Sequence, residues 1–204
     1  MTRLDPRPPD VPPGYPREYE RRLRLADGRH VWIRPVVPAD ASTLAAAIRN
    51  ADQDTLHRRF LDGDPRVTPA LVEHLTNLDY TRRFALGAAD EPTGRGVAIV
   101  RYEPLREGVA EVAVAVDPAW RRVGLATALL ETLAEAALDR GIHTFCATFL
   151  AENQPVTALV RLVGPDVKRS IQEGIAEFSI ALNREQVERA IRELPHDDGS
   201  TAQT

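Results

Sequence analysis

The residues best suited to chemistry lie where a strand-like apolar run is followed by a turn and a long helix-like run. The turn contains two adjacent cations, Arg121 and Arg122, followed by Gly124. The first turn of a helix leaves backbone N–H groups unpaired and carries the positive end of the helix dipole. Glycine allows a close backbone approach, Ala126 is small, and Thr127 adds a hydroxyl. The pattern predicts an anion site suited to a pyrophosphate, with plain strand-to-helix packing as the alternative.

A second candidate for chemistry, Glu111, lies near the start of the same strand-like run. Alternation along a strand places its side chain on one face with Val109, Ala113 and Ala115, which are all uncharged. A carboxylate above such an apolar floor loses part of its hydration and becomes a stronger base. We therefore expect Glu111 to act as a general base, with an ordinary exposed strand glutamate as the alternative.

Three other reactive side chains are weaker candidates. A histidine on a helix or strand face is more often structural than catalytic, and this applies to His74, expected on an apolar helix face, and to His143. Cys146 alternates within a predicted core strand, and we expect it to be a small buried hydrophobe and not a nucleophile. No cluster of Cys and His indicates a metal site.

The elements that must position these residues alternate between short β-branched runs and helical patterns. The order is hairpin, helices, three-strand run, long helix, strand, helix and hairpin, which predicts an α+β fold with a mixed sheet and helices on its faces. Expected strands cover residues 20–25, 30–36, 83–88, 96–102, 109–116, 142–150, 167–171 and 175–182. Expected helices cover residues 41–50, 53–61, 70–77, 123–140 and 153–163, and a last helix carries the apolar stripe Val187, Ala190, Ile191 and Leu194.

One domain, residues 18–194, is expected between two disordered ends, residues 1–17 and 195–204. Six prolines fall within the first 16 residues, and proline there prevents both a helix and a central strand. The last residues are small and polar.

The composition restricts the class of protein. With 26 basic and 30 acidic residues, the net charge of −4 argues against a general nucleic-acid binder. No apolar run approaches the ~20 residues of a membrane span, and the N-terminus lacks the apolar core of a signal peptide. The single cysteine cannot form an internal disulfide, so a cytoplasmic location is expected.

The anion-site segment also matches a known pattern. Arg121-x-x-Gly124-x-Ala126, after a strand that ends Val116-Asp-Pro-x-Trp120, resembles the acetyl-CoA-binding motif of the GNAT acetyltransferase superfamily. The resemblance implies the GNAT fold, with a mixed, mostly antiparallel sheet flanked by helices.

The likeness extends over roughly residues 30 to 182. Upstream, Ile33-Arg34-Pro35-Val-x-Pro38-x-Asp40-Ala41 is similar to the opening strand and first helix of the superfamily. The segments Tyr15-Pro16 and Leu25-Ala-Asp27-Gly28 further resemble bacterial GNAT domains of the protein lysine acetyltransferase type.

The resemblance implies a role for each matching residue. Amides of the turn would hold the pyrophosphate, the strand would pair with the pantetheine arm, and an amide near Val114–Ala115 would polarise the thioester carbonyl. Glu111 matches the glutamate that such relatives use as base, and Asn153 matches a residue that contacts the cofactor arm, with a helix cap as the alternative. The implied cofactor-binding residues are Val114, Val116, Arg121, Arg122, Val123, Gly124, Ala126, Thr127 and Asn153.

The expected function is that of an acetyl-CoA-dependent N-acetyltransferase, which transfers acetyl to a primary amine, a protein lysine or a small amine, in a ternary complex. One departure favours an alternative: Val160 stands where many relatives have a tyrosine that protonates the leaving thiolate. The alternatives are a catalytically degenerate acyl-CoA-binding regulatory module and a structural domain without cofactor. The apolar stripe of the last helix packs either on the domain or on a second copy, so a homodimer is also open.

Overall fold

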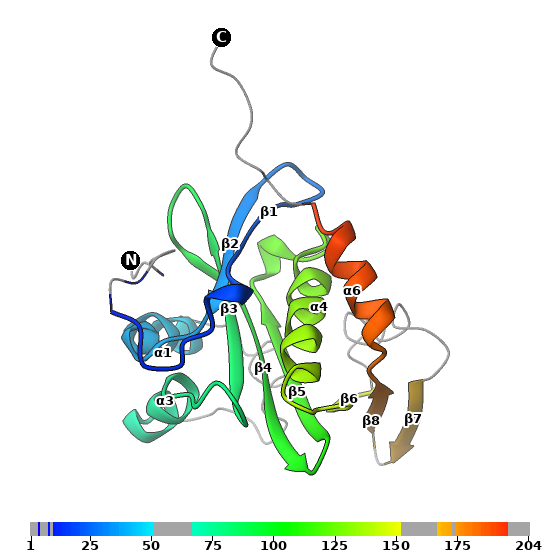
Figure 1. Ribbon diagram of the computed structural model, residues 1–204. Helices are drawn as coiled ribbons and strands as arrows, with labels where there is room; N and C mark the ends of the chain where they lie inside the picture. Colours follow the sequence, from blue (N-terminus) through cyan, green and yellow to red (C-terminus); the bar gives the residue numbers. More distant parts are fainter. Residues whose placement is uncertain are drawn as a thin grey trace.

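An eight-stranded sheet forms the centre of the part of the chain that the structure describes (Figure 1). The computed structural model describes Leu4, Pro8 and residues 10–50, 67–151, 167–172 and 174–195. The strands lie in the order β1-β2-β3-β4-β5-β6-β8-β7, and every neighbouring pair is antiparallel except β5 and β6. They are β1 (Arg21–Arg24), β2 (His30–Pro35), β3 (Phe84–Asp90), β4 (Gly96–Arg106), β5 (Val109–Val116), β6 (Thr144–Leu150), β7 (Val167–Gln172) and β8 (Ile175–Ala181).

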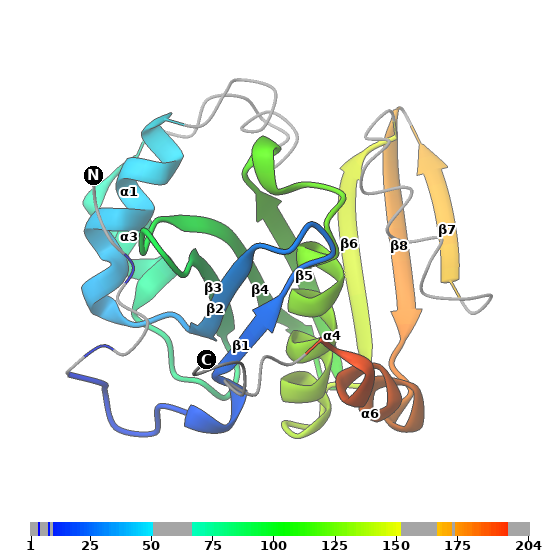
Figure 2. The same cartoon turned by 90° about the horizontal axis from the view of Figure 1, so that it is seen from above.

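Helices cover both faces of this sheet (Figure 2). On one face lie α4 (Leu125–Leu138) and α6 (Arg184–Glu193), and on the other lie α1 (Ala41–Asn50) and α3 (Pro69–Thr76). Three single 3₁₀ turns, η1 (Arg17–Tyr19), η2 (Pro38–Asp40) and η3 (Pro118–Trp120), connect described elements. The prediction of an α+β fold with a mixed, mostly antiparallel sheet flanked by helices is confirmed.

The main core lies between α4 and the sheet. Leu129 and Leu133 of α4 are fully buried, as is Tyr102 of β4, whose ring stacks on that of Phe84 with centroids 5.9 Å apart. Burying each of these leucines contributes roughly 1.5–3 kcal/mol. The leucines spaced four residues apart, which predicted this helix, therefore also form its buried face.

The helix α4 is shorter than expected at both ends. It begins at Leu125 because Gly124 before it has a left-handed φ of 88°, which a helical residue does not adopt. It ends at Leu138, before a turn in which Gly141 has a φ of 75°.

The strand β4 is longer than expected and continues to Arg106, although residues 103–106 contain Pro104. A shift in register between Pro104 and Arg106 marks an irregularity in the ladder, and proline is tolerated in strands at such places. As a consequence, Glu103 lies within the sheet, directly across from Glu111 of β5.

The single parallel pair in the sheet is short. β5 and β6 pair only over Val109–Glu111 and Thr144–Cys146, whereas β6 pairs with β8 from Thr144 to Leu150. The two strands therefore part after Glu111 and Cys146. The helix α4 provides the crossover between them, as parallel neighbours require.

The segment expected to be a flexible arm contributes contacts to the domain. Leu4 is buried and its N–H donates to the carbonyl of Gly94 at 2.7 Å. The ring of Tyr15 meets the ring of Tyr80 edge-on, with centroids 5.8 Å apart. At the other end, Pro195 accepts a hydrogen bond from the N–H of Arg24 at 3.0 Å. The expected helices 53–61 and 153–163 and the tail beyond Pro195 lie outside the described residues.

Candidate active site

The loop between β5 and α4, residues 117–124, is tied to the sheet at its start. The N–H of Asp117 donates to the carbonyl of Val97 at 2.9 Å, and its carboxylate accepts from the N–H of Ala119 at 2.9 Å. The Nε of Arg121 donates to the carbonyl of Val116 at 3.2 Å. The guanidinium of Arg121 thus shapes the loop itself, in addition to the phosphate role expected for it.

The end of this loop presents backbone N–H groups at the start of α4. Arg122 has a φ of 62° and Gly124 a φ of 88°, and both residues are exposed. The N–H of Ala128 donates to the carbonyl of Gly124 at 3.0 Å, which closes the first turn of the helix. The amides from Gly124 to Thr127 precede that bond and carry the positive end of the helix dipole. The predicted anion-binding residues are therefore brought together at one helix terminus.

The strand β5 continues toward this loop beyond its pairing with β6. Residues 112–116 pair with β4 on one side only, because the ladder to β6 ends at Glu111. Val112, Val114 and Val116 pack their side chains toward the main core. Backbone groups of alternate residues along this stretch face the side of β6, where an extended ligand can pair with them as an added strand.

Glu111 lies at the point where β5 and β6 part. It is directly opposite Glu103 of β4 and level with Cys146 of β6, so the three side chains share one face of the sheet. This is the face away from the core under α4, to which Ala110 and Val112 contribute. Glu111 is exposed, which differs from the partial desolvation expected from its alanine neighbours, because alanines at alternate positions are too short to cover it.

A polar network that the sequence reasoning missed lies beside Glu111. The carboxylate of Glu103 forms an ion pair with the nearly buried Arg101 and accepts from Nε2 of His74 at 3.0 Å. His74 comes from α3, where the buried residues are Val72, Leu75 and Thr76. His74 is therefore exposed and polar-facing, and not part of an apolar helix face as expected. The register of the hairpin formed by β4 and β5, which places Glu103 across from Glu111, is the signal that would have revealed this network.

The partners of His74 fix its tautomer. Nη1 of Arg83 lies 3.1 Å from Nδ1 of His74 and also donates to the His74 carbonyl at 3.1 Å. A guanidinium has only donors, so Nδ1 must accept and the ring proton must be on Nε2, which donates to Glu103. Both ring nitrogens of His74 therefore have protein partners, Arg83 on one side and Glu103 on the other.

The sequence model of the acetyltransferase (GNAT) family matches residues 45–164, which is more than half of the chain. The chain belongs to the GNAT acetyltransferase family. An acetyltransferase of Pseudomonas aeruginosa is 32% identical to this GNAT acetyltransferase over 143 residues, 69% of this chain and 77% of the relative.

Two solved structures extend the comparison. The GNAT domain of S. lividans PAT has a TM-score of 0.75 and 30% identity, over 82% of this chain and 99% of that domain. The structure of Mycobacterium smegmatis RimJ in complex with CoA-disulfide has a TM-score of 0.63 at 20% identity, over 85% of this chain and 92% of that one. The second likeness shows a shared fold.

The other residues that the sequence of this GNAT acetyltransferase singled out lie outside the loop between β5 and α4. His143 is exposed, and its backbone bonds to Gly108 and Leu182. Cys146 is half-buried beside Glu111, and not the fully buried hydrophobe expected. Asn153 and Val160 lie outside the described residues.

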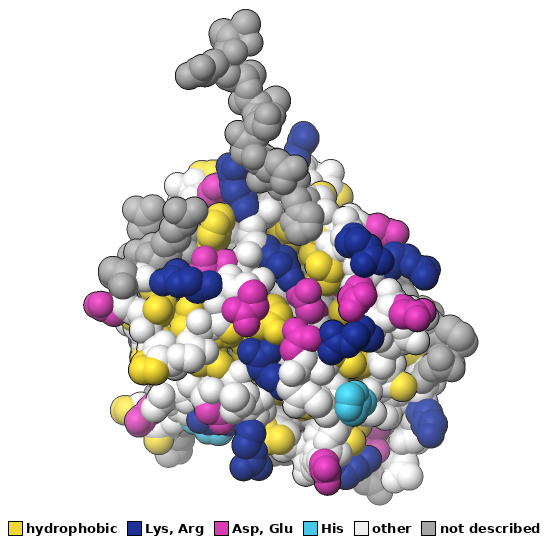
Figure 3. All heavy atoms as spheres, in the orientation of Figure 1, with side chains coloured by type: hydrophobic (Ala, Val, Ile, Leu, Met, Phe, Trp, Pro, Cys, Tyr) yellow, Lys and Arg dark blue, Asp and Glu magenta, His cyan; other side chains and the backbone are white. Residues whose placement is uncertain are grey.

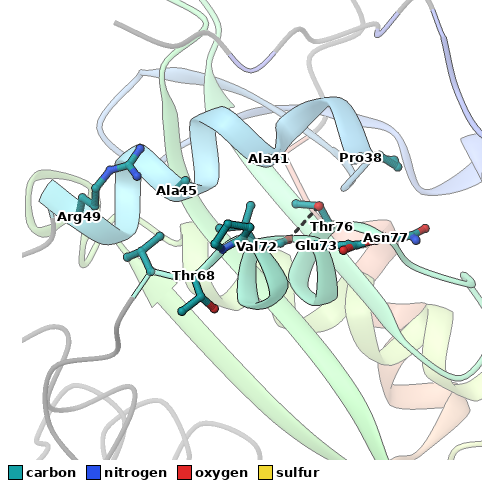
Figure 4. Close-up of a pocket in the computed structure, with 11 residues that line it drawn as sticks. Pro38, Ala41, Ala45, Arg49, Thr68, Val72, Glu73, Thr76 and Asn77 are labelled. Carbon is teal, nitrogen blue, oxygen red and sulfur yellow. Dashed lines mark hydrogen bonds between the residues drawn. The ribbon is translucent and has the colours of Figure 1, made fainter.

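A cavity of about 530 Å³ lies between α1 and α3 (Figure 4). Ala41 and Ala45 of α1 line it opposite Val72 and Thr76 of α3, and the Thr76 hydroxyl is turned back to the Val72 carbonyl at 2.9 Å. Among the residues that the structure describes, no predicted site residue lines this cavity. It lies on the same side of the sheet as Glu103, because His74 on α3 reaches that carboxylate.

Metal-ligand clusters, basic stripes and membrane-spanning helices are features that would indicate other kinds of function. Within residues 10–50, 67–151, 167–172 and 174–195, no three His, Cys, Asp or Glu side chains are grouped as metal ligands. On the face shown in Figure 3, basic and acidic side chains are interspersed and form no single basic stripe. None of the described helices has the length and apolar character that crossing a membrane requires.

Proposed function

We propose that the protein transfers an acetyl group from acetyl-CoA to a primary amine, a protein lysine or a small amine, by direct attack in a ternary complex. The observation that carries the proposal is the position of Glu111. It lies where β5 and β6 part, at one end of a strand whose other end leads into the N-terminus of α4. A donor bound along this strand would have its pyrophosphate at the helix and its thioester near the carboxylate.

The backbone supplies the binding groups for the donor. Amides from Arg122 to Thr127 would hold the pyrophosphate, with the exposed Arg122 adding a cation. The pantetheine arm would add to β5 along Ala113–Val116. The CoA-disulfide complex of RimJ supports a CoA ligand on this fold.

The transfer step uses Glu111 and a backbone amide. Glu111 takes a proton from the ammonium of the acceptor, directly or through a water, and the free amine attacks the thioester carbon. A backbone N–H near Val114–Ala115 stabilises the negative oxygen of the tetrahedral intermediate. The nitrogen of the intermediate releases its extra proton to solvent, the carbon–sulfur bond breaks, the amide forms, and CoA departs as a thiolate that takes a proton from solvent. Val160 at the usual tyrosine position fits this route, because a thiolate leaves without an acid.

The residues around Glu111 support a cationic acceptor, and the cysteine content supports a cytoplasmic setting. Glu103 and Glu111 place two carboxylates on the acceptor face, which attract an ammonium group. The likeness to the GNAT domain of PAT, together with the segments at Tyr15-Pro16 and Asp27-Gly28, supports a protein lysine as acceptor. The single cysteine is consistent with a reducing compartment.

Calorimetric titration with acetyl-CoA tests the donor site. Gly124→Glu should abolish binding, because it places a carboxylate where the pyrophosphate is expected. A Cβ at Gly124 would meet nothing within 4 Å, so the substitution causes no clash, although any side chain is strained at its φ of 88°. Gly141→Glu is the matched control: Gly141 has a φ of 75°, has equally open surroundings and lies at the other end of α4. Unchanged affinity in Gly124→Glu would reject the site.

The catalytic role is tested separately by Glu111→Gln. We expect acetyl-CoA binding to be retained and turnover of a responsive amine to fall about 100-fold, the amount typical of a lost general base. Retained turnover would reject Glu111 as the base. Acetyl-CoA binding without turnover of any amine or lysine peptide by the wild-type protein would favour the non-catalytic acyl-CoA-binding module.

A further inference from the structure

The turn between β1 and β2 packs against the loop that precedes α4. The N–H of Ala26 donates to the carbonyl of Val123 at 3.2 Å. Nη2 of Arg29 donates to the carbonyl of Ala119 at 2.9 Å, and the guanidinium carbon lies 3.7 Å from the centre of the Trp120 ring. The turn therefore contacts the loop at three points spread over five residues.

Arg29 is held in position by its own turn before it meets the loop. Asp27 accepts from the Nε of Arg29 at 2.7 Å and from its backbone N–H at 3.1 Å. The N–H of Leu25 donates to the carbonyl of Arg29 at 2.8 Å, and Gly28 has the φ of 85° that this tight turn requires. A guanidinium fixed in this way loses little further freedom when it stacks on Trp120.

The loop needs such support because its backbone is strained. Arg122 adopts a φ of 62°, which costs a non-glycine residue roughly 1–2 kcal/mol, and surrounding contacts must hold it there. The bonds to Ala119 and Val123 grip the loop on either side of Arg122. Both bonds engage carbonyl groups of the loop, so neither occupies one of its N–H groups.

We propose that Arg29 is a positioning residue for acyl-CoA binding, which holds the 117–124 loop in the conformation that receives the pyrophosphate. This inference rests on the proposed function of the loop. A loop held in its binding conformation avoids the ordering cost that a free loop incurs when the ligand binds. Arg29 acts on the loop in this proposal, because its guanidinium contacts Asp27, Ala119 and Trp120.

The test is Arg29→Ala in the full chain, measured by calorimetry with acetyl-CoA, steady-state kinetics and thermal unfolding. We expect the Kd and KM for acetyl-CoA to rise about tenfold, equivalent to about 1.4 kcal/mol, with kcat within about twofold of wild type. A merely structural role would lower the melting temperature and leave the Kd of the folded protein unchanged. An unchanged Kd, with wild type binding normally, overturns the inference. Absence of binding by wild type itself would reject the proposed function of the loop, and this inference with it.

Arg17→Ala is the matched control. Arg17 also pairs with a carboxylate, that of Glu20 at 3.4 Å, and lies 5.7 Å from the ring centre of Tyr15. Its 3₁₀ turn, however, contacts the opposite end of α4 through Tyr19, which donates to Asp139 at 2.7 Å. We expect its Kd for acetyl-CoA to equal that of wild type, and an equal loss in both variants would contradict a specific role for Arg29.

A second variant, Arg29→Lys, keeps the experiment decisive if Arg29→Ala fails to fold. Lysine retains the charge but lacks the planar group that stacks on Trp120 and donates to two partners at once. We expect an intermediate effect, with the Kd for acetyl-CoA raised about threefold, a difference of about 0.65 kcal/mol. A Kd equal to that of wild type would contradict the role of the stacked guanidinium.

Discussion

Asp40→Ala is expected to be among the most destabilising single substitutions in this protein. Asp40 accepts two parallel hydrogen bonds from Arg34, at 2.8 and 2.7 Å, and a third from the N–H of Val37 at 2.9 Å. The Arg34 side chain is 0% exposed. Removing the carboxylate would take from a buried guanidinium the counter-charge and the two hydrogen bonds that Asp40 provides, and from the N–H of Val37 its bond to the same carboxylate.

The expected loss follows from this burial. Breaking a buried ion pair by removing one partner costs about 3–5 kcal/mol. Since domains are stable by roughly 5–15 kcal/mol in total, this is a large share of the free energy of unfolding. For a domain of this size it corresponds to a fall in the melting temperature of about 10 °C.

Urea unfolding of wild type and Asp40→Ala, with thermal unfolding beside it, measures the effect. Glu188→Ala is the control, because Glu188 belongs to an exposed pair with Arg184 at 4.0 Å, and such pairs contribute well under about 1 kcal/mol. A loss below about 1 kcal/mol in Asp40→Ala would show that Arg34 finds other compensation, and would refute the argument.

Three further predictions concern charges elsewhere. Glu103→Gln removes one of the two carboxylates on the acceptor face and should raise the KM for a cationic amine about threefold while kcat changes less, which steady-state kinetics would show. Because Glu103 also pairs with the nearly buried Arg101, the variant should be less stable, and thermal unfolding measures that loss separately. The pKa of Glu131 is raised above 4.5, mainly by burial and secondly by the carboxylate of Glu193. The stability of the fold therefore falls as the pH rises from 4.5 through this raised pKa. Glu131→Gln should therefore raise the melting temperature at pH 7 by about 2 °C and less at pH 4; an equal gain at both pH values would contradict this. Two opposing effects act on the pKa of Asp139. Burial raises this pKa, but hydrogen bonds, of which the one from Tyr19 is the largest, outweigh the effect of burial and lower the pKa below 3.8. The stability that the Asp139 carboxylate contributes is present above pH 3.8 and is lost as the pH falls through the lowered pKa. In an acid titration followed by circular dichroism, Asp139→Asn should therefore unfold less steeply than wild type.

Local patterns in the sequence were enough to predict most described elements. The run from Val109 to Val116 and the helix from Ala41 to Asn50 have the expected bounds, because alternation and a helical period determine them without long-range help. The loop of Arg122 and Gly124 was predictable for the same reason, since its strand, turn and helix are adjacent in the chain.

Long-range pairing set the features that the sequence did not predict. The network of His74, Glu103 and Arg101 joins α3 to β4, and Glu103 is paired with Glu111 because β4 continues beyond residue 102, where the expected strand ended. The exposure of Glu111 likewise depends on what covers its face of the sheet, which residue alternation does not reveal. The contact of Arg29 with Trp120 joins residues about 90 positions apart, so no local pattern reports it.

The three-residue ladder between β5 and β6 has a consequence for cooperativity. The strands β6, β8 and β7 carry a second hydrophobic cluster around Phe149 and Phe178, and Phe145 of β6 joins the core under α4. Little sheet pairing therefore couples the two parts, and the smaller part can open on its own at a lower free energy than global unfolding. Native-state hydrogen exchange should show amides of β8 exchanging before those of β4. The boundary between these two parts of the sheet lies beside Glu111, where the acetyl group is proposed to pass from CoA to the amine.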